Sequence, residues 1–69
     1  MALNWPEWFR KVFRDASHHE SSMFENSLSA EEQQTIIAAI ESRKSNTDDH
    51  SKLVRYFEEL VEARPYRRG

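Results

Sequence analysis

Half of the aromatic residues of this chain lie in one short segment near its start. Trp5, Trp8, Phe9 and Phe13 fall within nine positions. At about 100° per residue, their side chains occupy one broad arc of a helix, and the charged residues of the segment occupy the other. The spacing therefore predicts an amphipathic helix whose apolar face is either core or contact surface.

The start of this helix carries its own signals. Asn4 is the expected N-cap, and Glu7, three residues later, is its expected reciprocal partner. Pro6 falls in the first turn, where a missing N–H costs nothing. We therefore expect the helix to begin at Trp5 and to reach at least Ala16.

The stretch that follows allows two interpretations. The segment 17–20 matches a second capping box, which would start a new helix at His18. Met23 and Phe24, however, continue the apolar face of the first helix, and no Gly or Pro interrupts the segment. A continuous or kinked helix over 5–26 is the favoured prediction, and two helices are the alternative.

Two further helices are expected. Ser29 and Glu32 form a third capping box, which predicts a helix from Ala30 to about Arg43. Its apolar stripe is made of Ile36, Ile37 and Ile40.

The last helix should be capped by Thr47 or Asp48 and should run to about Arg64, just before Pro65. Phe57 and Leu60 lie on its central apolar stripe and are expected in the core.

Together these elements predict one small all-α domain over residues 1–69, a bundle of three helices, possibly four, joined by short polar loops. Residues 1–3 are a lead-in, and residues 65–69 are a basic tail. The chain has one glycine and no cysteine, which excludes disulfides and thiolate metal sites. Helix packing or self-association must therefore stabilise the domain.

Charge and hydropathy narrow the classes of function. The formal net charge of −2 does not favour a protein whose main task is to bind a nucleic acid backbone. No apolar run reaches the length of a membrane span, and no signal peptide is visible at the N-terminus. We therefore expect a cytoplasmic protein, with neither a membrane span nor a membrane surface as its site of action.

No catalytic, cofactor-binding or metal-binding motif is recognisable. Adjacent His18 and His19 would point about 100° apart on a helix and do not chelate one ion together, and His50 is expected at the half-buried edge of its helix. A bundle of this size is also expected to leave little room for a pocket of about 300 Å³. The prediction is no enzyme, no cofactor and no metal.

The remaining hypothesis is binding to another protein, as a regulator, adaptor or inhibitor. Large aromatic residues are favoured contact anchors, and Trp is hard to enclose in a small core. The predicted contact residues are Trp5, Trp8, Phe9, Arg10 and Lys11. The partner is either another protein or a second copy of this chain as a homodimer. The alternative is a nucleic-acid-associated regulator with a helix-turn-helix-like pair and the basic tail.

Overall fold

Residues 4–63 fold into four helices, and all regular structure within them is helical. The computed structural model describes residues 4–63, so the predicted lead-in and basic tail lie outside it. The helices are α1 (Glu7–Asp15), α2 (His18–Ser27), α3 (Ala30–Lys44) and α4 (His50–Ala63). The all-α prediction is confirmed, and the described residues contain the fourth helix that the sequence left open.

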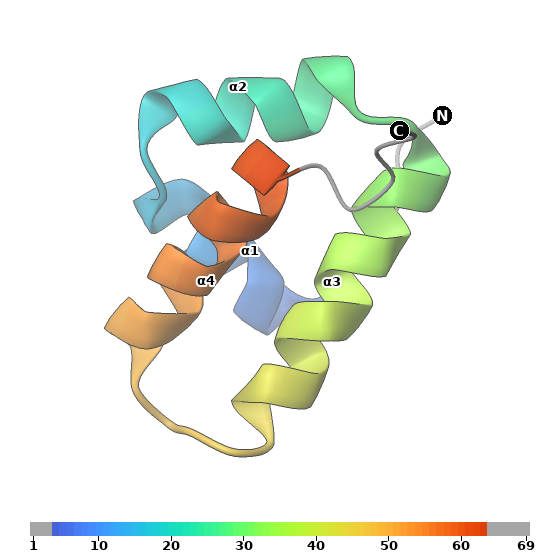
Figure 1. The fold of residues 1–69 in the computed structure, drawn as a ribbon. Coiled ribbons are helices and arrows are strands. Elements are labelled where there is room, and N and C mark those ends of the chain that lie inside the picture. Colours follow the sequence, from blue (N-terminus) through green and yellow to red (C-terminus); the bar gives the residue numbers. More distant parts are fainter. Residues whose placement is uncertain (1–3, 64–69) are drawn as a thin grey trace.

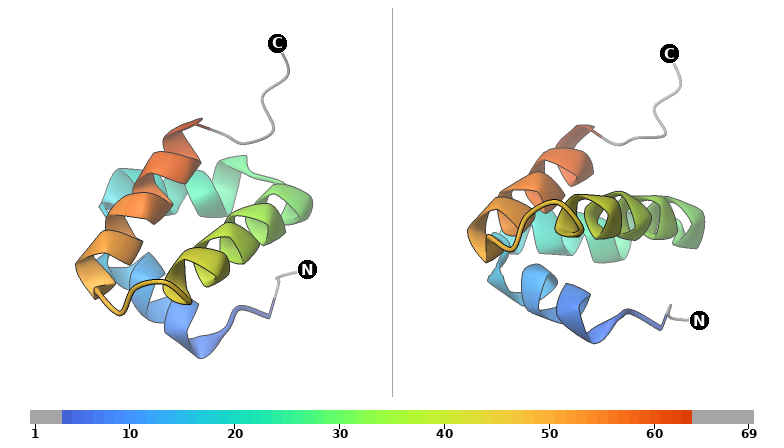
Figure 2. Two further views of the ribbon diagram at one scale, coloured as in Figure 1. Left: turned by 60° about the horizontal axis from the view of Figure 1, so that its bottom comes forward. Right: turned by 90° about the horizontal axis from the view of Figure 1, so that it is seen from below.

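Helix α4 is the central element. It packs against α1, α2 and α3, with α2 across one end of the bundle and α1 behind α4 in the view of Figure 1. The two views of Figure 2 show α1 on a separate level from α3. Each of the other helices therefore packs part of its apolar face against α4.

The first helix begins later than predicted. Pro6, with φ −62° and ψ 153°, occupies the N-cap position and makes no side-chain cap, so Asn4 is not the cap. The reason is steric, because a proline disfavours helical geometry at the residue before it, which here is Trp5. Trp5 therefore precedes the helix, although its ring still packs on the core.

Residues 5–26 form two helices, so the favoured prediction of one continuous or kinked helix is wrong. Ala16 and Ser17 are extended, with ψ values of 165° and 152°. One straight helix would separate Phe9 and Phe24 by about 22 Å along its axis, whereas their ring centroids are 5.4 Å apart. The break thus allows α2 to fold back over the face of α1.

Hydrogen bonds hold this break in place. The Ser17 hydroxyl accepts from the backbone N–H of Glu20, as the capping pattern predicted. The Ser17 N–H donates to Glu58 on α4 at 2.7 Å, and the Ser21 hydroxyl donates to the carbonyl of Phe13 at 2.9 Å. Polar groups freed at the end of α1 and the start of α2 are therefore satisfied locally or by α4.

The later helix boundaries agree more closely with the sequence. Helix α3 starts at the predicted capping box, in which Ser29 and Glu32 each bond the other's backbone N–H. For α4 the predicted cap is wrong by one residue, because the Asp49 carboxylate accepts from the N–H of Ser51 at 3.0 Å.

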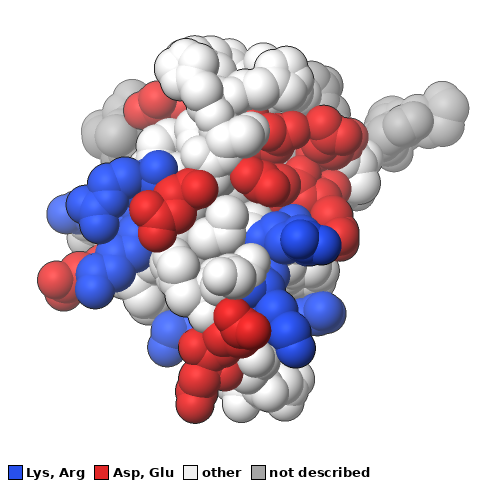
Figure 3. Space-filling view, turned by 90° about the vertical axis from the view of Figure 1, so that its left-hand side faces the viewer, with Lys and Arg blue, Asp and Glu red and all other residues white. Residues whose placement is uncertain are grey.

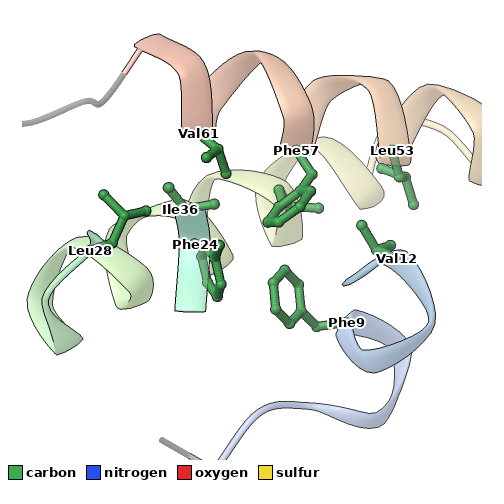
Figure 4. Close-up of a cluster of buried hydrophobic side chains, with 9 residues drawn as sticks. Phe9, Val12, Phe24, Leu28, Ile36, Leu53, Phe57 and Val61 are labelled. Carbon is green, nitrogen blue, oxygen red and sulfur yellow. The ribbon is translucent and has the colours of Figure 1, made fainter. Parts of the chain in front are cut away.

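The core is a cluster of rings and branched side chains where the four helices meet. Figure 4 shows Phe57 and Val61 of α4 facing Phe9 and Phe24. The ring centroids of Phe57 lie 5.2 Å from Phe24 and 5.6 Å from Phe9. Phe57 is fully buried as predicted, but Leu60 is only half-buried at the edge of the core. The buried apolar residues are Phe9, Val12, Phe24, Leu28, Ile36, Ile40, Leu53, Phe57 and Val61.

Candidate functional site

The predicted contact residues do not form one surface. Phe9 is fully buried, so it belongs to the core and is removed from the candidate contact surface. Trp5 is half-buried, and its ring centroid lies 4.8 Å from Phe13 and 5.5 Å from Phe24. Most of the Trp5 ring therefore serves the core as well. Its indole N–H is buried and makes no hydrogen bond to a described residue.

Trp8 and Lys11 differ from the other three because they line a surface hollow of about 450 Å³. Helix α1 supplies one wall of this hollow. The end of α3, the loop after it and the first turn of α4 supply the other walls. The full lining is Glu7, Trp8, Lys11, Val12, Lys44, Thr47, Asp48, His50 and Leu53. The expectation that a domain of this size leaves little room for such a pocket is wrong.

The floor and the rim of the hollow have different chemistry. Val12 and Leu53 are buried and give an apolar floor. The half-buried Trp8 ring stands beside it, with its centroid 5.8 Å from that of Phe9 in an edge-on arrangement. The ammonium group of Lys44 lies 5.8 Å from the Trp8 ring centroid, within the range of a cation–π contact. The Trp8 ring therefore lies between the core residue Phe9 and the ammonium group of Lys44.

Charged groups of both signs surround this apolar centre. Lys11 and Lys44 form no ion pair with any described residue, and the same holds for Glu7 and Asp48. Within residues 4–63, none of these four rim charges is therefore neutralised by a partner of opposite charge. Arg10 is exposed, but it does not line the hollow.

His50 lies where the hollow meets the end of α1. Its Nε2 atom is 2.7 Å from Oδ2 of Asp15, and the two side chains are 45% and 50% exposed. A little more than half of the His50 side chain is therefore covered, which is close to the predicted half-buried edge position. Among residues 4–63, no serine or threonine hydroxyl hydrogen-bonds His50, so the pair lacks the activated nucleophile of a Ser-His-Asp triad.

A second polar cluster joins α2 to α4. Ligand atoms of His19, Glu20 and Glu62 lie within 4.8 Å of one another. The Ser17 hydroxyl bonds Glu20 and is the largest cause of a lowered pKa of that carboxyl, followed by the hydrogen bond with Glu62. The hydrogen bond with Glu20 and the charge of Glu20 raise the pKa of Glu62.

The face of the bundle drawn in Figure 3 carries charges of both signs. Figure 3 shows Lys and Arg interspersed with Asp and Glu over this face rather than joined into a basic surface. The basic tail of the alternative hypothesis lies outside the described residues. Within residues 4–63, no helix has both the length and the apolarity needed to cross a bilayer.

Sequence reasoning identified Trp8 and Lys11 but missed the rest of the hollow. The sequence predicts Asp48 only as a possible helix cap, and it does not mark Lys44 or Leu53 as contact residues. No local pattern reveals that these residues meet α1. Comparisons with protein-family models, with curated proteins and with solved structures find no significant match to this chain.

Proposed function

We propose that this protein is a small non-enzymatic interaction domain, acting as a regulator, adaptor or inhibitor, and that it binds a partner protein in the hollow beside Trp8. The observation that carries the proposal is a half-buried Trp ring next to an apolar floor inside a hollow of about 450 Å³. The anchor residues of protein–protein interfaces cluster in pockets of this kind, with apolar groups at the centre and charged groups at the rim.

The chemistry of the hollow specifies the kind of occupant. Val12, Leu53 and Trp8 fit an apolar or aromatic side chain of the partner. Lys11 and Lys44 would receive carboxylates beside that side chain, and Glu7 and Asp48 would receive cations. The partner is therefore a protein segment with an apolar anchor flanked by charges, carried by a different protein or by a second copy of this chain.

Adjacent cations on α1 give the proposal a matched test. Lys11 lines the hollow and Arg10 does not, although both are exposed. Sedimentation of the purified chain first measures self-association. A pull-down from an extract of the source cell then compares the proteins bound by wild type with those bound by Trp8→Ala. Each protein that binds wild type only is identified, purified and titrated against the variants.

The expected result is a loss of affinity confined to the hollow. Trp8→Ala should weaken binding of the purified partner, or self-association, by about 30-fold or more, as for an interface hot spot. Lys11→Ala should weaken it measurably, Arg10→Ala should leave it unchanged, and all three variants should keep the helical circular dichroism signal. A partner that binds Trp8→Ala and wild type equally would refute the assignment of the hollow.

A further inference from the structure

The cluster of His19, Glu20 and Glu62, here called the α2–α4 cluster, is built by two helices. His19 and Glu20 lie in the first turn of α2, and Glu62 lies in the last turn of α4. The Ser17 N–H bond to Glu58 fixes the start of α2 against α4. Tertiary packing, not local sequence, therefore brings the three side chains together.

The two carboxylates of this cluster face each other. Glu20 is only 9% exposed, and it forms no ion pair with a described residue. The adjoining hollow of about 250 Å³ is lined by Glu20, Arg55, Glu58, Glu59 and Glu62, so one arginine accompanies four carboxylates. A buried carboxylate held against a second carboxylate is unfavourable unless a proton or a cation lies between them.

We propose that the α2–α4 cluster is a binding site for a divalent transition-metal ion of the Zn²⁺ class, with His19, Glu20 and Glu62 as its three protein ligands. The imidazole distinguishes it from a simple acidic patch, because one nitrogen and two carboxylate oxygens suit Zn²⁺ better than Ca²⁺ or Mg²⁺, which prefer oxygen alone. The site is independent of the hollow beside Trp8.

The geometry is close to what such an ion needs. Ligand bonds of about 2.1 Å in a tetrahedral arrangement place ligand atoms about 3.4 Å apart, and the three groups now lie within 4.8 Å of one another. His19 and Glu62 are exposed, so a rotation of their side chains would close this difference. Glu20 is oriented by the Ser17 hydroxyl, as outer-shell partners orient metal-binding carboxylates.

The chain offers matched controls for a direct test. His18 neighbours His19 on the same helix but is not in the cluster, and Glu41 is an exposed glutamate on α3. Untagged full-length protein, stripped with EDTA and dialysed, is titrated with ZnCl₂ by calorimetry near pH 7. Circular dichroism confirms that each variant is folded.

We expect one Zn²⁺ per chain for wild type. His19→Ala and Glu62→Gln should each lower the association constant at least about tenfold, since changing even an outer-shell partner has an effect of about 10–100-fold. His18→Ala and Glu41→Gln should leave it within about twofold. The proposal is overturned by an absence of binding at 100 μM Zn²⁺ (roughly the weak end of useful affinities), by unchanged affinity in Glu62→Gln, or by an equal loss in His18→Ala.

Discussion

Replacing Phe57 by Ala tests whether α4 organises the core. Phe57 is fully buried, and its ring contacts the rings of Phe9, Phe13 and Phe24 at centroid distances of 5.6, 6.2 and 5.2 Å. Truncating a buried Phe to Ala costs about 3–5 kcal/mol. A 69-residue domain has a free energy of unfolding of about 3–10 kcal/mol in total. The substitution should therefore remove a large part of the stability, or all of it.

Thermal unfolding followed by circular dichroism measures this effect. At about 4–8 °C per kcal/mol for a domain of this size, Phe57→Ala should lower Tm by at least about 12 °C or leave the chain unfolded. Leu60→Ala is the matched control on the same helix, because Leu60 is only half-buried and its truncation should cost about 1–2 kcal/mol. A Tm loss in Phe57→Ala no larger than that in Leu60→Ala would refute the packing described here.

Three further predictions concern polar groups. Ser29→Ala should lower the free energy of unfolding by about 0.5–2 kcal/mol in urea denaturation, because it removes a capping-box acceptor, whereas Ser29→Asp should stay near wild type. Asp15→Asn should change stability by less than about 1 kcal/mol, since its ion pair with His50 is about half exposed; a larger change would show a buried role. Glu62 has a raised pKa, so its contribution to stability is present below the ordinary value of 4.5 and is lost as pH rises through the raised pKa. Glu20 has a lowered pKa, so its contribution is present above 4.5 and is lost as pH falls through the lowered pKa. In EDTA, the Tm of Glu62→Gln relative to wild type should therefore increase from pH 4.5 to pH 7, and a constant difference would contradict the carboxylate pairing.

The sequence predicted a helix boundary correctly where a single local signal, such as a capping box, determined it. The Ser29 capping box is local, and the structure confirms it. At Asn4 two local rules competed, and the steric effect of Pro6 on Trp5 overrode the capping pattern. At Ser17 the capping signal was present in the sequence. Whether the chain forms two helices there or one continuous helix depends on the packing of Phe24 against Phe9, which is a tertiary contact.

The candidate sites were harder to predict for the same reason. A helical wheel places Trp8 and Phe9 on one face, but only the neighbouring helices decide which ring is enclosed. Phe9 is covered by α2 and α4, whereas Trp8 faces the end of α3. The α2–α4 cluster was invisible for the same reason, because Glu62 has no sequence relation to His19 and meets it only through the packing of α4.

Helix α4 contributes to both sites, which raises the question of whether they are coupled. Leu53 lines the hollow beside Trp8, and Glu62 belongs to the α2–α4 cluster. At 1.5 Å per residue, these positions are about 13 Å apart along the helix, with the fully buried Phe57 between them. Substitutions more than about 7–10 Å apart with no shared partner usually have additive effects, within about 0.3–0.5 kcal/mol. The change in the free energy of unfolding of a Trp8→Ala, Glu62→Gln double variant in EDTA should therefore equal the sum of the two single changes. A coupling energy above about 1 kcal/mol would show that the two positions interact through the packing of α4.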